Sequence, residues 1–385
     1  MSFKEIIRKK DIQSTLLTLL FTSIGFGVIL PILPFYSETF GATAFDLGML
    51  TALFAFISLI LSPVIGKISD KVGRKKVLMA GTIGFMISYL MFAYANSLQM
   101  LFVARAIEAV AAAGIFPACA SLISDFTTEQ ERGKAMAMVG MTFSLGFIMG
   151  PALGGLAGIL SIQGAFFVAA FFSGINFVSV YFQLKEPKEK AESKNIPGKE
   201  LSLLQHIKSP LLLVFMAGTM TAFLIGGLQA VLALYTQEKF GFGASEVGII
   251  FTAIGILIMV FQFISGSLVG KYGEIRMIQV GVLFSTIGFT TLAFADGWIT
   301  LLFSLGILVM GNAFVFPSVS SYVSKKAQGK RGAVMGLIAS FQSFGQFIGP
   351  LFAGFLYHVN PPFAFFGLGA VTFIYFIIFL VVEKP

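Results

Sequence analysis

The sequence contains little charge and few reactive side chains. Only 11% of its 385 residues are Asp, Glu, Lys or Arg, whereas soluble domains carry about 25%. The single cysteine, Cys119, excludes an intrachain disulfide. There are only two histidines, and no H-E-x-x-H, P-loop or G-x-S-x-G pattern. The low charge excludes a water-soluble globular domain, and we expect no metal, no cofactor and no enzymatic activity.

The sequence is instead rich in long apolar runs. Apolar residues make up 57% of the chain, and its mean hydropathy is +0.91. Uncharged runs of about 20 residues, the length that crosses a bilayer, recur from one end to the other. The predicted fold class is therefore an all-α polytopic membrane protein with twelve transmembrane helices. We place these helices at residues 14–36, 45–69, 77–95, 98–123, 133–158, 164–184, 210–236, 246–269, 277–295, 298–323, 332–357 and 362–382.

Lys and Arg gather on one side of this arrangement. With the N-terminus in the cytosol, 24 of the 26 cations fall in cytosolic segments. The exceptions are Arg105, inside a predicted helix, and Lys239, on the outer side. The positive-inside rule therefore places both termini in the cytosol. We expect a multi-pass protein of the cell (plasma) membrane, whose net charge of +8 meets anionic lipid and not nucleic acid.

The chain consists of two similar halves. Five stretches recur in the same order at an offset of 199 or 200 residues, among them FGATAFDLG at 40–48 and FGFGASEVG at 240–248. The predicted domains are two pseudo-symmetric six-helix bundles, 1–184 and 210–385. A charged, solvated cytosolic linker, 185–209, joins them. Such repeats are typical of secondary transporters, which bind their substrates near the membrane midplane. A channel is the alternative, but no filter-like segment is present.

Four motifs resemble those of one family of transporters, the major facilitator superfamily. GKISDKVGRKKVL at 66–78 resembles its signature loop between the second and third helices. LFVARAIEAVAAAG at 101–114 resembles its fourth-helix motif, with Ala109 where the family usually has Gly. GFIMGPALGG at 146–155 resembles the fifth-helix motif associated with antiporters, and GFGVILPILPFY at 25–36 resembles the first helix of twelve-span drug:proton antiporters. The resemblance implies the major facilitator fold and proton-coupled export.

The loop between the second and third predicted helices mixes cations with an acid. Gly66 lets a neighbouring helix approach closely, and Gly73 allows a sharp turn. Asp70 can cap the N-terminus of a neighbouring helix, which the resemblance identifies as the eleventh. Arg74 can pair with an acid at the end of the fourth helix, where Asp125 is the candidate. The resemblance implies that these residues form a conformational latch on the cytosolic side.

The fifth predicted helix carries a regular row of small residues. Gly146, Gly150 and Gly154 recur every four residues and form a smooth groove, while Pro151 kinks the helix. The eleventh helix repeats the pattern with Gly345, Gly349 and Pro350. We predict that these surfaces let helices of opposite halves pack tightly and rock. Generic small-residue packing in the membrane is the alternative.

Two charged residues lie deep in a predicted helix, Arg105 and Glu108. Their spacing of three residues places them on one helix face. Charges inside the membrane are costly and usually functional. Glu108 is the one carboxylate that we place deep within a span, so we predict that it carries protons with Arg105 beside it. A static ion pair that makes both charges tolerable is the alternative.

The resemblance implies that the first, fourth, seventh and tenth helices line a central cavity. The candidates for substrate contact there are Phe26, Phe116, Gln229, Asn312 and Phe316. The 45 Phe residues suit hydrophobic or amphipathic substrates. Related multidrug exporters often carry carboxylates in the first, seventh or tenth helix. This chain has none there, which departs from the pattern for cationic drugs.

These observations predict a secondary active transporter that exports small hydrophobic or amphipathic compounds by rocker-switch alternating access, coupled to protons. The expected partners are a small-molecule substrate, protons and the lipid bilayer, and we expect a monomer. The alternatives are a facilitator or a proton-coupled transporter of a sugar, lipid or other metabolite. A membrane-embedded enzyme or a non-transporting receptor is a further alternative, but no catalytic constellation is present.

Overall fold

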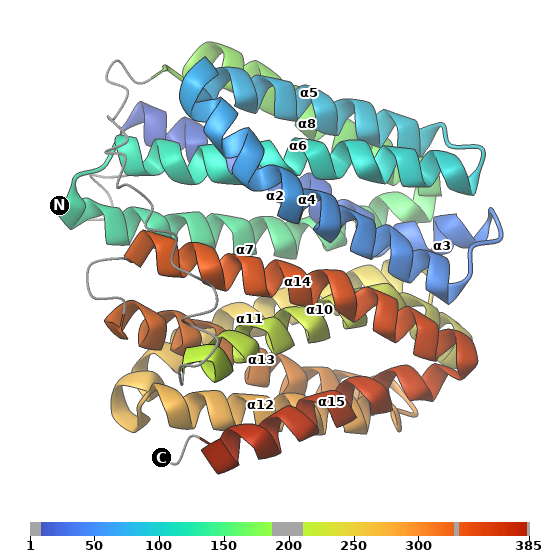
Figure 1. Ribbon diagram of the computed structural model, residues 1–385. Coiled ribbons are helices and arrows are strands. Elements are labelled where there is room, and N and C mark those ends of the chain that lie inside the picture. The colour runs from blue at the N-terminus through green and yellow to red at the C-terminus, as the bar shows by residue number, and fades with distance from the viewer. Residues whose placement is uncertain (1–8, 187–210, 327–330, 383–385) are drawn as a thin grey trace. The chain divides into compact units, whose positions relative to one another are not determined.

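The computed structural model describes residues 9–186, 211–326 and 331–382, and these parts are helical with short connections (Figure 1). The helices follow the predicted order. They are α2 (Lys10–Ile29), α3 (Leu33–Glu38), α4 (Ala44–Val72), α5 (Arg74–Ala93), α6 (Leu98–Asp125), α7 (Glu129–Leu160), α8 (Ile162–Gln183), α10 (Leu211–Phe240), α11 (Ala244–Tyr272), α12 (Glu274–Leu292), α13 (Trp298–Lys326), α14 (Arg331–Val359) and α15 (Pro361–Val382).

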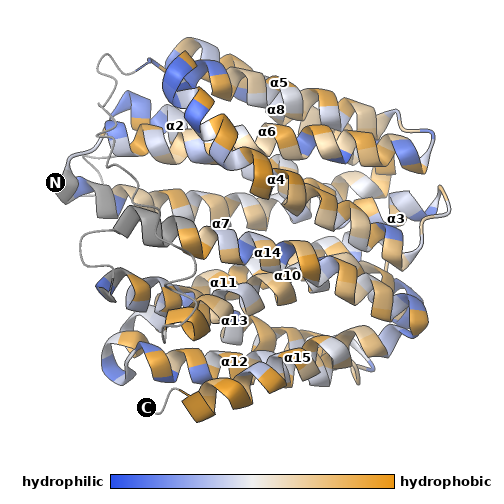
Figure 2. Cartoon of the chain, in the orientation of Figure 1, coloured by the Kyte–Doolittle hydropathy of each residue, from blue (hydrophilic) through white to orange (hydrophobic). Residues whose placement is uncertain are grey.

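The predicted membrane architecture is confirmed. Eleven helices in the described parts are long and apolar enough to cross a bilayer. The twelfth long helix, α14, spans 29 residues but carries Gln342, Gln346 and several glycines, which lower its hydropathy. Figure 2 shows apolar residues along the helices and hydrophilic residues mostly toward their ends.

The first predicted span, 14–36, is not one continuous helix. It is divided into α2 and α3 around Pro31. Proline has no backbone N–H and cannot continue the helical ladder. The N–H of Leu30 donates to the Gly27 carbonyl instead (3.3 Å), and α3 then begins at Leu33. The corresponding helix of the second half, α10, has no proline and runs unbroken for 30 residues.

Glycines with positive φ close equivalent turns in the two halves. Gly73 (φ 104°) separates α4 from α5, and Gly273 (φ 84°) separates α11 from α12. Side chains other than glycine rarely adopt this conformation. The repeat seen in the sequence is therefore also present in the backbone, at an offset of 200 residues.

The chain forms two compact units. Unit 1 comprises Met1–Gly41, Phe56–Ile196 and Phe242–Gly255, and unit 2 comprises Ala42–Ala55, Pro197–Gly241 and Ile256–Pro385. In unit 1, α2 packs against α7 and α8, and α5 packs against α6 and α8. Unit 2 repeats this scheme, with α10 against α14 and α12 against α13 and α15. The boundaries at 185 and 209 remain predictions, and most of the predicted linker lies outside the described residues.

A tyrosine fixes the same helix end in each unit. In unit 1, the buried Tyr36 donates its hydroxyl hydrogen to the Ala95 carbonyl just after α5 (3.0 Å). In unit 2, Tyr235 donates to the Leu292 carbonyl at the end of α12 (2.9 Å). Each hydroxyl thus satisfies a carbonyl that a helix end leaves without a partner in the helix. We call these two contacts the tyrosine locks.

Candidate functional site

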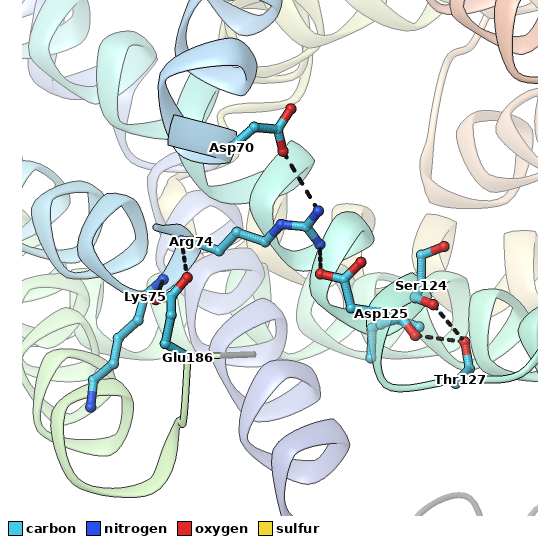
Figure 3. A network of polar contacts seen from close by, with 8 residues as sticks. Asp70, Arg74, Lys75, Ser124, Asp125, Thr127 and Glu186 are labelled. Atoms are coloured by element: carbon cyan, nitrogen blue, oxygen red, sulfur yellow. Dashed lines mark hydrogen bonds and ion pairs between the residues drawn. The ribbon is translucent and has the colours of Figure 1, made fainter. Parts of the chain in front are cut away.

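The residues of the predicted latch come together at the Gly73 turn (Figure 3). Arg74 forms an ion pair with Asp125, the last residue of α6, and both side chains are largely buried. Asp70, one turn earlier on α4, lies 3.5 Å from the same guanidinium and is mostly exposed. Arg74 therefore joins the end of α4 to the end of α6.

Two residues at the end of α8, Glu186 and Tyr181, strengthen this turn, and the sequence reasoning missed them. The Glu186 carboxylate, just after α8, accepts hydrogen bonds from the backbone N–H groups of Arg74 (2.7 Å) and Lys75 (2.9 Å) (Figure 3). The Lys75 ammonium donates to the Tyr181 carbonyl in the last turn of α8 (2.7 Å). Three consecutive cations at the start of a helix oppose its dipole. That unfavourable start was the sequence signal that a carboxylate should lie nearby.

Two predictions for this loop remain predictions. A methyl group added at Gly66 would meet no atom within 4 Å among the described residues, so no close helix approach is seen there. The predicted capping of the eleventh helix by Asp70 would be a contact between the two units, and nothing in the structure tests it.

A second ion pair holds the start of α2. Lys9 lies 2.9 Å from Glu131 in the first turn of α7 and also donates to the Phe126 carbonyl (3.2 Å). The hydrogen bond from Lys9, followed by that from the Thr128 backbone N–H, lowers the pKa of Glu131 below its ordinary value. Glu131 therefore stays ionised at neutral pH.

The glycine row of α7 packs within its own half, which corrects the prediction that it joins opposite halves. A Cβ atom at Gly150 would lie 2.6 Å from the Gly27 Cα on α2, and Gly154 lies directly against Val28. In the second half, Gly345 and Gly349 lie equally close to α10. The physical reason is the spacing: residues four apart share one helix face, and that face receives the first helix of the same half.

The neighbouring face of each helix makes the contact with the other half of the sequence. A Cβ atom at Gly155 would lie 3.3 Å from the Gly248 Cα on α11. A Cβ atom at Gly354 on α14 would lie 3.3 Å from the Gly48 Cα on α4. The last glycine of each motif and the carbonyls of Pro151 and Pro350 therefore face the other half of the sequence, whereas the row of four-residue spacing does not.

The two charges inside the membrane form a buried ion pair. The Arg105 guanidinium lies 2.7 Å from Glu108 Oε2, and the side chains are 4% and 0% exposed. Arg105 also covers the ring of Phe26 on α2, with its guanidinium carbon 5.6 Å from the ring centroid. The second carboxylate oxygen, Oε1, is buried and makes no hydrogen bond to the described residues. Such an oxygen is costly to leave unsatisfied inside a membrane.

An aromatic row leads away from this pair. Phe26 contacts Phe147 (centroids 6.2 Å apart), Phe147 stacks on Phe143 (5.8 Å), and Phe143 contacts Phe116 (5.7 Å). Each ring is partly exposed. Two predicted cavity residues, Phe26 and Phe116, are thus linked through two residues of α7 that sequence reasoning missed. Their spacing of four residues was the available signal.

The other cavity candidates lie in unit 2. Asn312 is buried, Gln229 is partly buried and Phe316 is 46% exposed. Their shared role in one cavity with the first-half residues remains a prediction. Within residues 9–186, 211–326 and 331–382, no group of three or more His, Cys, Asp or Glu side chains could hold a metal ion.

Comparisons with known proteins agree with this geometry. Multidrug resistance protein 2 of Bacillus subtilis is 30% identical over 379 residues, covering 96% of this chain and 95% of that protein. The class B tetracycline resistance protein of Escherichia coli is 32% identical over 366 residues, covering 91% and 90%. The quinolone resistance protein NorA of Staphylococcus aureus is 29% identical over 343 residues, covering 88% of each.

Solved structures share the fold. The nucleoside transporter NupG superimposes with a TM-score of 0.80 at 16% identity, covering 98% of this chain and 100% of that one. The human organic anion transporter MFSD10 gives 0.70 at 22% identity, covering 96% and 99%. The family model of the Major Facilitator Superfamily matches residues 15–327 and 214–385. The chain therefore belongs to the Major Facilitator Superfamily, a family of transporters and not of enzymes.

Proposed function

We propose that this transporter exports small hydrophobic or amphipathic compounds in exchange for protons. Its relatives are named for resistance to multiple drugs, to tetracycline and to quinolones, and two of them cover more than nine tenths of the chain. The repeated architecture supports export by alternating access, with the bundles 1–184 and 210–385 rocking about a midplane site. In this proposal the protein works as a monomer in the plasma membrane, with both termini in the cytosol.

The buried Arg105–Glu108 pair is the observation that carries the proton coupling. A carboxylate is tolerable deep in the membrane either when it is paired or when it is protonated. Here Arg105 holds one oxygen, while the other, Oε1, makes no hydrogen bond to the described residues. Protonation of Glu108 removes its negative charge and weakens the pair with Arg105. A cavity that opens alternately to each side could therefore load and release one proton at this carboxylate.

The aromatic row supports the proposed substrate class. It begins beside Arg105 and presents the partly exposed rings of Phe26, Phe147, Phe143 and Phe116. Ring faces accept flat apolar groups of many shapes, because stacking and dispersion require little directional matching. A substrate bound along this row would also lie close to the charge of Glu108, which allows proton uptake and substrate binding to compete.

The Gly73 turn is proposed as the latch of the transport cycle. Arg74 ties α4 to α6 through Asp70 and Asp125. Ion pairs at a water-exposed end are weak enough to break and form again at each turnover. In this proposal the latch is closed when the site faces outward.

Transport into sealed vesicles tests the function. Purified protein is reconstituted into vesicles with an acidic lumen, and the uptake of ethidium, tetracycline and a quinolone is followed after dilution into neutral buffer. We expect accumulation of at least one probe in the wild type and its loss in Glu108→Gln. Glu238→Gln, at an exposed position near the end of α10, is the matched control that should transport normally. Accumulation that ignores the pH gradient, or that persists in Glu108→Gln, contradicts the proposal.

A further inference from the structure

A buried tyrosine lies beside the Arg105–Glu108 pair and is not accounted for by the proposed mechanism. Tyr89 on α5 has an exposed fraction of 0%, and its hydroxyl makes no hydrogen bond to the described residues. Its oxygen lies beside Gly25 of α2, next in the chain to Phe26, whose ring the Arg105 guanidinium covers. The adjacent Ser88 donates to the Ala104 carbonyl (2.8 Å), which fixes α5 against α6 at this level. An unsatisfied buried hydroxyl costs free energy, so its presence requires an explanation.

The second half of the chain provides an internal comparison. At an offset of 200 residues, Phe289 replaces Tyr89, and the two charges are replaced by Leu305 and Leu308. All three replacements are at most 1% exposed. The offset is reliable here because Gly81 lies against Ile115 and Gly281 lies against Val315. The helical hairpin therefore packs well with apolar residues at these positions, and the fold itself does not require the hydroxyl or the charges.

A compensating change makes room for the hydroxyl. A Cβ atom at Gly25 on α2 would lie only 2.9 Å from the Tyr89 oxygen. In the second half, the corresponding residue is Leu224, which is 1% exposed. This correspondence uses the offset of 199 residues at which Gly27 and Gly226 both lie against the proline of a neighbouring helix. The first half thus combines a larger polar side chain with a smaller neighbour, and the second half does the reverse.

We infer that Tyr89 is a positioning residue for Glu108, a role that rests on the proposed function of Glu108 as the proton carrier. When the carboxylate moves away from Arg105 during the cycle, the Tyr89 hydroxyl donates a hydrogen bond to it. The proton that is transported binds to and leaves the Glu108 carboxylate, while Tyr89 keeps its own proton throughout. The hydroxyl thereby stabilises the ionised carboxylate in the state in which the pair with Arg105 is loosened.

No other titratable group of the packed helices lies at this level. Those on α2, α5, α6, α7 and α8 are near the helix ends, except Cys119, which is about three turns from Glu108 along α6. These groups are Lys10, Asp11, Arg74, Lys75, Lys76, Cys119, Asp125, Glu129, Glu131, Arg132, Lys134 and Tyr181. Among the titratable side chains of these helices, Arg105 and Tyr89 are therefore the ones at the level of Glu108.

Infrared titration of the purified full-length protein tests this role without a known substrate. The C=O stretching band of the protonated Glu108 carboxyl group is assigned by its loss in Glu108→Gln, and its intensity is followed against pH. We expect Tyr89→Phe to move the titration midpoint to higher pH by about half a unit or more, because one hydrogen bond to the carboxylate is lost. Tyr375→Phe, which removes a hydroxyl that donates to Leu213 in unit 2, is the matched control and should leave the midpoint unchanged.

A second variant protects the test against misfolding. Gly25→Ala keeps Tyr89 but places a methyl group 2.9 Å from its oxygen, closer than an ordinary contact, so the ring must move and the midpoint should shift as well. A Tyr89→Phe protein that is monodisperse and titrates like the wild type overturns the role of Tyr89 and leaves the role of Glu108 standing. If Glu108→Gln removes no titrating band, the proton-carrier role of Glu108 is wrong, and the role of Tyr89 is wrong with it.

Discussion

The hairpin α5–α6 of the first half and the hairpin α12–α13 of the second half are built alike but charged differently. Arg74 pairs with Asp125 in the first, and Glu274 pairs with Lys325 in the second. These positions correspond at an offset of 200 residues, so the charges are exchanged while the ion pair is kept. Both hairpins therefore carry a pair of opposite charges at this end, beside Gly73 or Gly273, but the helix that carries the cation differs between them.

The two hairpins differ most in the middle of their helices and are alike at the end away from Gly73 and Gly273. The buried cluster of Tyr89, Arg105 and Glu108 corresponds to three apolar residues in the second half. At the far end both hairpins keep the same tyrosine lock, made by Tyr36 and Tyr235. The tyrosine locks, which both halves retain, are expected to serve the fold. The second half packs with apolar residues where the first carries buried charges, which favours a role of those charges in transport.

The largest effect is expected from breaking the buried pair asymmetrically. Glu108→Leu removes the carboxylate that neutralises the Arg105 guanidinium in the membrane interior and should cost about 3–5 kcal/mol of stability. The triple variant Tyr89→Phe, Arg105→Leu and Glu108→Leu copies the second half and should be as stable as the wild type, or more stable by about 1–4 kcal/mol. Thermal unfolding in detergent measures both.

The triple variant also separates folding from function. It should reach the membrane and unfold cooperatively, but it should not accumulate any probe in response to a pH gradient. A triple variant as unstable as Glu108→Leu would show that the first half needs its polar cluster for packing. The conclusion that these residues serve transport and not the fold would then be wrong.

Charge exchange at the Gly73 end should have an intermediate effect. Arg74→Glu alone brings three acids together with Asp70 and Asp125 and should cost about 1–3 kcal/mol. Arg74→Glu with Asp125→Lys recreates the polarity of the second half and should recover most of that stability. Unfolding of the two single variants and the double variant gives the coupling energy. A double variant whose loss of stability equals the sum of the two single losses would show that the exchanged charges do not form a pair.

The same exchange in the second half should matter less. Lys325 is 70% exposed, so Glu274→Arg with Lys325→Asp should differ from the single variants by only about 0.2–1 kcal/mol. Gradient-driven transport should be nearly normal in this double variant. The latch proposal predicts that Arg74→Glu loses transport, and an equally large loss in the second-half double variant would show that both loops are part of the latch.

The smallest effect concerns the helix starts. The first turn of α12 carries its own acid, Glu274, whereas α5 begins with cations and takes its carboxylate from Glu186. Glu186→Gln should therefore cost about 0.5–1 kcal/mol at low salt and less at high salt. Unfolding measured at two ionic strengths checks this. A cost that is the same at both would attribute the contact to geometry and not to charge.

Much of this architecture follows from the sequence alone. Hydropathy, glycine turns and the internal repeat predicted the helices, and the motif loop predicted the pairing of Arg74 with Asp125. The break at Pro31 was missed because a window of hydropathy does not sense one missing N–H. The packing direction of Gly150 was wrong because spacing defines a helix face but not the partner that occupies it.

Other features required the structure because they depend on contacts between distant segments. Glu186 lies more than a hundred residues from the helix that it caps, and its sequence surroundings resemble an ordinary charged linker. The contacts of Phe26 with Phe147 and of Tyr89 with Gly25 cross between helices, so no pattern along one helix contains them. The burial of Glu108 inside a helix beside Arg105 was predictable, since a carboxylate in the middle of an apolar run is rare.

Proton release on substrate binding tests the central claim most directly. Calorimetric titration of the purified protein with a transported probe, in buffers of different ionisation enthalpy, counts the protons released for each molecule bound. The account predicts that the wild type releases protons near the pH at which Glu108 titrates, and that Glu108→Gln binds the probe with no release. Equal proton release by the two proteins would show that another group carries the proton.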